Sequence, residues 1–193
     1  MVNQPPRRQR FNLTDTGNAH RMAYRHGHEI RYCHPWDKWL IWDGLRWRPD
    51  DKGSIVARAK GTAVTISSET ATSRNEEERG QIVTWSRHSE SAARIRAMVS
   101  LAKSEPGIPV VPDELDQDPW LLNVLNGTID LRNGELGPHD PDHMITKLAP
   151  VGYDPTASCP LWLQFLDKIM DGNEGLIQFL KRAIGYSLTG IIR

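Results

Sequence analysis

The chain has 193 residues, which is long enough for one domain or two small ones with a hydrophobic core. Hydrophobic residues make up 38% of it and charged residues 25%, as is usual for a globular protein, and no apolar run is long enough to span a membrane. Cys33 and Cys159 are too few for a disulfide framework and no secretory signal is evident, so we expect a cytoplasmic protein.

Charge is balanced over the whole chain, with 24 basic and 24 acidic residues, but not along it. Residues 1–50 hold nine lysines and arginines against five acidic residues, residues 51–105 hold nine against seven, and residues 106–193 hold six against twelve. A basic front indicates a surface that faces an anion such as nucleic acid, although solvated surface charge explains so small a bias equally well.

The front of the chain begins with polar, basic and proline-containing residues, which predict a disordered arm over residues 1–10. A helix is expected from about Asp15 to His26, with Thr14 or Asp15 capping its start. Arg21 and Arg25 lie four residues apart and would form a positive ridge on that helix.

A tryptophan-rich hairpin follows, with apolar segments at residues 38–42 and 45–48 on either side of Asp43-Gly44. Asp-Gly between apolar segments predicts a two-residue type I′ turn, in which both residues have positive φ. Residues 29–33 are expected to add a third strand. Apolar spacing then predicts helices over about 54–67, 76–88 and 92–103.

The back of the chain starts with a connector rich in proline and acidic residues, over residues 106–119, which marks the expected boundary. Asn-Gly turns at Asn126 and Asn133 predict a small β-meander, and residues 143–149 are expected to form one more strand. Pro160 suits the first position of a helix over about 160–170, and a last helix is expected over about 174–188. The sequence thus indicates an α+β protein, mostly helical, with an N-terminal Trp-rich β-hairpin and a small β-meander before two C-terminal helices. Its expected subdomains are residues 11–105 and an acidic part, 106–193.

Signals of catalysis or metal binding are weak. Four histidines and a cysteine between residues 20 and 34 match no zinc-ligand spacing, and there is no Gly-x-Ser-x-Gly nucleophile motif. The acidic pair Asp140-Pro-Asp142 follows no apolar strand, so a metal-binding carboxylate pair is not indicated. A Walker A phosphate loop needs a Gly-Lys pair, and the chain has none. We therefore expect no catalytic residue, metal ligand or cofactor-binding residue in this chain.

Contact with nucleic acid is the function that the residues support most directly. In and beside the hairpin, cations are interleaved with four tryptophans, Trp36, Trp39, Trp42 and Trp47. Aromatic faces stack on unpaired bases while cations bind phosphates. The same tryptophans can instead pack in the core, and the sequence leaves both interpretations open. The candidate contact residues are Arg21, Arg25, Arg31, Lys38, Trp39, Trp42, Arg46, Trp47 and Arg48.

Several motifs occur in a fixed order along residues 11–190. They are Thr14-Asp15-x-Gly17-Asn18-Ala19-x-Arg21, the hairpin from Trp39 to Trp47, the turn Leu125-Asn126-Gly127-Thr128, Tyr153-Asp154-Pro155, Cys159-Pro160-x-Trp162 and Gly185-Tyr186-Ser187-Leu188-Thr189-Gly190. Together they resemble the region just upstream of the superfamily 3 helicase domain in phage and plasmid primase–helicases, to which a region of the poxvirus replicative primase–helicase is related.

The resemblance implies a DNA replication protein. In the family a primase part comes first and a ring-forming, ATP-dependent helicase domain comes last, so ATP and magnesium are expected only for that domain. Only three residues follow Gly190 here, so we expect a truncated product or a separated domain. The implied function is a non-catalytic collar or adaptor that supports oligomerisation and guides DNA. Its partners would be single-stranded or forked DNA and other copies in a ring. The alternative is a free-standing DNA-binding or regulatory protein that reuses this domain.

Overall fold

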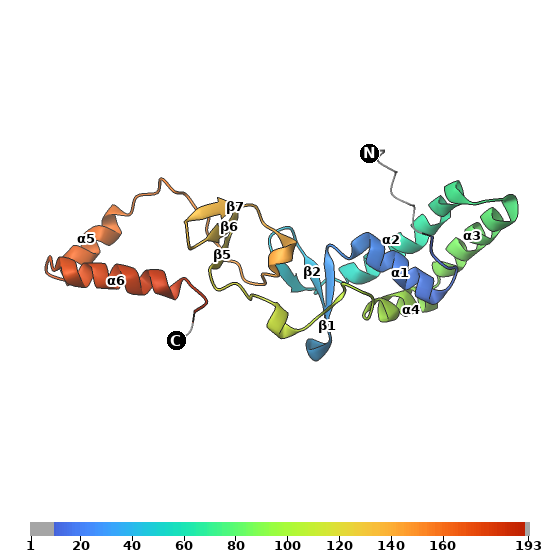
Figure 1. Ribbon diagram of the computed structural model, residues 1–193, viewed down its shortest axis with the longest axis horizontal. Helices are drawn as coiled ribbons and strands as arrows, with labels where there is room; N and C mark the ends of the chain where they lie inside the picture. Colours follow the sequence, from blue (N-terminus) through green and yellow to red (C-terminus); the bar gives the residue numbers. More distant parts are fainter. Residues whose placement is uncertain (1–9, 192–193) are drawn as a thin grey trace, which may run out of the picture. The chain divides into compact units, whose positions relative to one another are not determined.

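A computed structural model describes residues 10–191, so the expected basic arm lies outside the described residues except for Arg10. The described chain contains six α-helices and two small sheets, which confirms the α+β, mostly helical prediction (Figure 1). It divides into two compact units. The first comprises the described residues up to Trp42 together with Arg48–Pro112, and the second comprises Asp43–Trp47 and the chain from Asp113 onward.

Four helices build most of the first unit (Figure 1). They are α1 (Asp15–His26), α2 (Ser54–Thr65), α3 (Glu76–Ser89) and α4 (Ala92–Ala102), with a 3-10 segment, η2 (Ile66–Thr72), after α2. Side-chain oxygens of Thr14, Asn75 and Ser91 accept backbone N–H bonds at the starts of α1, α3 and α4, as N-caps do. All four helices predicted for this part of the chain are confirmed.

The sheet of the first unit has the strand order β3-β2-β1-β4. Its strands are β1 (Ile30–Cys33), β2 (Lys38–Trp42), β3 (Trp47–Pro49) and β4 (Pro109–Val110), and a 3-10 turn, η1 (His34–Trp36), joins β1 to β2. β1 runs antiparallel to β2, with Ile30 opposite Ile41 and Tyr32 opposite Trp39. These four side chains therefore share one face, which packs into the core with α1, α2 and α4.

The turn at Asp43-Gly44 is wider than predicted. Of its two residues, Gly44 alone has a positive φ, at 95°, so the two-residue type I′ turn was wrong. The carboxylate of Asp43 accepts hydrogen bonds from the amides of Leu45 and Arg46, at 3.0 and 2.9 Å. These bonds stabilise a longer loop because they satisfy backbone donors that a tighter hairpin would pair across its strands.

The predicted meander is present in the second unit as β5 (Leu121–Val124), β6 (Gly127–Asp130) and β7 (Glu135–Gly137). Gly127 is required there because a Cβ atom would lie 2.3 Å from the carbonyl oxygen of Gly137. The strand predicted over residues 143–149 is wrong: a 3-10 turn, η4 (Pro141–His143), precedes a segment without a ladder. That segment makes isolated backbone bonds instead, such as Ala149 N–H to Asn123 O at 2.9 Å.

Two helices end the second unit, α5 (Pro160–Ile169) and α6 (Glu174–Ser187), and they form a helical hairpin (Figure 1). Pro160 lies in the first turn of α5, as predicted, and Asn173 caps α6 by accepting a bond from Leu176 N–H at 3.2 Å. The backbone N–H of Gly190 donates to the carbonyl of Pro119 at 2.8 Å, which joins the end of the hairpin to the start of the meander.

Candidate nucleic-acid interface

The two cations of the predicted ridge on α1 have different surroundings. Arg21 is fully buried, whereas Arg25 is half-buried in the last turn of the helix. Arg25 lines a pocket of about 410 Å³ with His26, Arg58 and Thr62, and makes no ion pair within residues 10–191. Its charge is therefore available to a ligand, and that of Arg21 is not.

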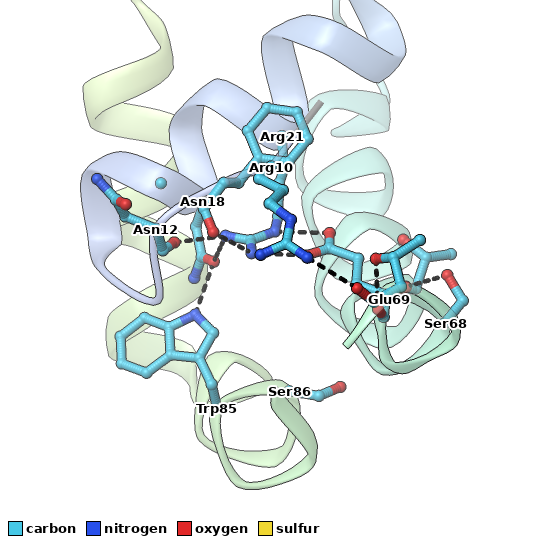
Figure 2. Close-up of polar contacts among 12 residues, drawn as sticks. Arg10, Asn12, Asn18, Arg21, Ser68, Glu69, Trp85 and Ser86 are labelled. Atoms are coloured by element: carbon cyan, nitrogen blue, oxygen red, sulfur yellow. Dashed lines mark hydrogen bonds and ion pairs between the residues drawn. The ribbon is translucent and has the colours of Figure 1, made fainter. Parts of the chain in front are cut away.

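Arg21 is held by hydrogen bonds on every side (Figure 2). Its guanidinium donates to both carboxylate oxygens of Glu69, at 2.8 and 2.7 Å, and to the carbonyls of Asn12 and Phe11 at 2.8 and 3.3 Å. A buried guanidinium is tolerated only when its charge is paired and its N–H groups are bonded. Arg21 thus joins the entry to α1 to the segment after α2, which is a structural role.

Asn18 extends this polar network (Figure 2). Its carbonyl accepts from the indole N–H of Trp85 at 3.0 Å, and its amide donates to the Ser89 hydroxyl at 3.0 Å. Asn18 and Ser89 are fully buried. The network therefore ties α1 to α3 through groups that satisfy one another.

Glu29 carries the most perturbed carboxyl group beside the Arg25 pocket. Arg58 donates to both of its oxygens at 2.9 Å, and His26 Nδ1 lies 2.8 Å from one of them. The hydrogen bond from Arg58 is the main reason that the pKa of Glu29 falls to about 2. Arg58 is thereby neutralised locally, which leaves Arg25 as the pocket's uncompensated cation.

The sheet directs the remaining front residues to different environments. Trp39 packs against the core with its ring 5.0 Å from that of Tyr32, so core packing accounts for it. Arg31 is half-buried and donates to the carbonyls of Gly27 and Ile30. Lys38, at the start of β2, is exposed.

The turn residues of the hairpin belong to the second unit. Trp47 is fully buried there, and its indole N–H donates to the carbonyl of Pro141 at 2.8 Å. Arg46 donates to the carbonyl of Thr146 at 3.3 Å. Trp42 and Arg48 are half-buried, and neither residue is without an interaction. Burial therefore leaves Trp47, like Arg21, no surface for a DNA strand to contact.

One exposed tryptophan of the first unit lies outside the nine candidate contact residues. Trp36, in η1, is 44% exposed, and the exposed Lys38 at the start of β2 lies two residues further along the chain. The place of Trp36 after Pro35, outside the alternating strand residues, is the signal that it is committed to neither face of the sheet.

The sequence-adjacent histidines and cysteine do not converge. His20 pairs with Glu105 at 3.3 Å, His26 with Glu29, and Cys33 is buried in β1. Across residues 10–191, no three or more His, Cys, Asp or Glu side chains are grouped so that they could hold a metal ion. None of the helices in that range combines the length and apolar character that a bilayer crossing requires.

Comparison with known families gives one finding for this chain. The model of a family described as D5 N terminal like matches residues 19–171, which is well over half of the sequence. The match covers the first unit from α1 onward, the meander and α5. No match was found among curated proteins.

Proposed function

Because the chain belongs to the D5 N-terminal-like family, the N-terminal region of phage and plasmid primase–helicase proteins, we propose that it acts as a non-catalytic collar or adaptor in DNA replication. The family match over residues 19–171 is the observation that carries this proposal. The proposed role has two parts, which are contact with DNA and association with further copies of the chain.

The DNA-contacting part rests on the cations that remain accessible. Arg25 and Lys38 lie in the basic front of the chain, and neither is paired with a carboxylate in the described residues. Arg31, Arg46, Arg48 and Trp42 are half-buried and keep part of their surface, whereas Arg21 and Trp47 keep none. With so few free cations, we expect binding to be weak and to depend strongly on salt.

The self-association part is supported by the α5–α6 hairpin. Within it, Leu166 and Ile177 are buried, but many large apolar side chains are not. Those that are 40% exposed or more are Leu161, Trp162, Leu163, Phe165, Ile169, Leu176, Phe179, Ile184 and Tyr186. An apolar surface of this extent is typical of an interface. The hairpin carries three acidic and three basic residues, so a second copy meets no net repulsion.

The test is the mass of the full chain in solution, measured by sedimentation with and without single-stranded DNA at low and at high salt. We expect concentration-dependent assemblies, and DNA binding that is lost as salt rises. The variant R25Q/K38Q should assemble as the natural chain does and bind DNA more weakly. A chain that stays monomeric and shows no affinity for single strands at low salt contradicts the proposal.

A further inference from the structure

Trp36 differs from the other tryptophans of the described chain in how it is presented. Trp47 is buried, and Trp39, Trp42, Trp85 and Trp120 are half-buried, whereas Trp36 and Trp162 are exposed. Trp162 belongs to the apolar surface of α5 and stacks on Phe165 at 5.7 Å. Trp36 lies instead at a corner between two strands, among polar residues.

The backbone at this corner is firmly held. Asp37 follows Trp36 in the left-handed conformation, with φ 49°, and its N–H donates to the carbonyl of His34 at 3.1 Å. The phenol of Tyr32, which is itself buried in the core, donates a hydrogen bond to the Asp37 carboxylate. The corner is therefore closed by a backbone bond and is fastened to β1 through Asp37.

Lys103, just after α4, completes this support. Its ammonium group donates to the Tyr32 hydroxyl at 2.7 Å, lies 3.5 Å from the Asp37 carboxylate, and is 4.2 Å from the centre of the Tyr32 ring. The ring of His34 packs edge-on against Tyr32 at 4.7 Å, and its Nε2 lies 3.2 Å from the carbonyl of Lys103. The hydrogen bond from Tyr32 lowers the pKa of Asp37, so the carboxylate stays ionised near neutral pH.

A firmly held backbone at an exposed indole is favourable for binding, because less conformational entropy is lost when a ligand orders the residue. A hydrophobic ligand would need an apolar surround, and the two residues that follow Trp36, Asp37 and Lys38, are charged and exposed. Lys38 is exposed two residues further on, and Lys103 is one-third exposed. An exposed aromatic ring two residues from a lysine that is unpaired within residues 10–191 suits a ligand that has both a flat ring and an anionic backbone.

On these grounds we propose that Trp36 is a stacking platform for an unpaired base of single-stranded DNA, with Lys38 contacting an adjacent phosphate. This proposal rests on the DNA-contacting part of the proposed function and adds a residue that reads the base rather than the backbone. Stacking of this kind tolerates any base, because every base has a π-face.

The experiment uses the full chain and two fluorescent strands of equal length, one of thymidines and one without bases, in fluorescence-anisotropy titrations at low salt. The abasic strand keeps every phosphate and removes only the stacking partner. We expect Trp36→Ala to weaken binding of the thymidine strand about five- to hundred-fold and to leave the abasic strand unchanged. Trp36→Phe should retain most of the affinity, and Leu101→Ala, a control at a similarly exposed apolar position of the same unit, should change neither titration.

Lys38→Gln gives an independent check, because a phosphate contact does not depend on the base. It should weaken binding of both strands equally and reduce the slope of log affinity against log salt concentration by about 0.7. Circular dichroism melting of each variant shows whether the corner still folds.

The stacking proposal would be overturned if Trp36→Ala lowered the affinity for both strands equally, or did not lower the affinity for the thymidine strand. Either result would leave the wider DNA-contacting role standing. A natural chain that binds neither strand would instead remove the DNA-contacting role, and the stacking role with it. If Trp36→Ala does not alter binding of the thymidine strand, the result would point to a protein partner for this corner.

Discussion

In the first unit even an arginine is fully buried, whereas in the α5–α6 hairpin leucines, phenylalanines and isoleucines remain in contact with solvent. Arg21 is buried because Glu69 and two carbonyls satisfy its charge and its N–H groups within the same unit. The hairpin does not bury most of its apolar side chains, because two helices can bury only the side chains that face each other. The first unit therefore has the features of a self-contained fold, and the hairpin has those of a surface that meets another molecule.

The largest effect is expected from breaking the Arg21 network. Arg21→Met leaves the Glu69 carboxylate without its partner, which should lower the free energy of unfolding of the first unit by about 3–5 kcal/mol. Urea denaturation followed by circular dichroism measures it. The double variant R21M/E69L removes both charges and should recover much of the loss. Arg96→Ala, at an exposed position on α4, is the control and should be nearly neutral.

Acid should weaken the first unit through Glu29. Its folded pKa of about 2 lies below the unfolded value of 4.5, so its contribution is complete above pH 4.5 and is lost as pH falls toward 2. Denaturation midpoints between pH 6 and pH 3, compared with those of Glu29→Gln, measure this contribution. The difference between the two proteins should shrink as pH falls. A difference that stays constant with pH would mean that the Glu29–Arg58 pair does not set the stability.

The smallest effect on stability is expected in the hairpin. Phe179 is 63% exposed, so Phe179→Gln should change the free energy of unfolding by no more than about 0.5 kcal/mol. The same substitution should shift sedimentation toward the monomer. Ile177→Ala, at a buried position two residues away, provides the contrast and should cost about 2 kcal/mol or more. If Phe179→Gln destabilised the fold as strongly, the comparison between the two regions would be wrong.

Local signals predicted most of the fold. Capping residues and apolar spacing located all six helices, and Asn-Gly turns located the meander, because these features act within a few residues of one another. The predictions that were wrong concern competition for backbone groups. The Asp43 carboxylate accepts hydrogen bonds from amides that a tighter hairpin would pair across its strands, and residues 143–149 make single bonds rather than a ladder.

The candidate site was harder to predict, because burial depends on residues far along the chain. Arg21 and Arg25 look equivalent by helical spacing, but Glu69, 48 residues beyond Arg21, removes one of them from the surface. Trp39 and Trp47 both lie in strands of the hairpin. The alternation of side chains along a strand does not show which tertiary partner each indole contacts. Among the four tryptophans weighed for base stacking, Trp36 could have been expected to be exposed because a proline precedes it and no strand alternation includes it.

The turn Asp43–Trp47 has a consequence for how this chain can be divided. The hairpin begins and ends in the first unit, but its turn belongs to the second, so the polypeptide passes between the units three times. The turn supplies the carbonyl of Leu45 to the Asn123 amide at 2.9 Å and the N–H of Trp47 to the carbonyl of Ile145 at 2.8 Å. A single proteolytic cut after Pro112 therefore leaves the first unit whole but separates the second unit from its turn. Expression of residues 113–193 alone would remove the backbone groups with which that turn bonds Asn123 and Ile145. No single break in the polypeptide separates the two units with both of them complete.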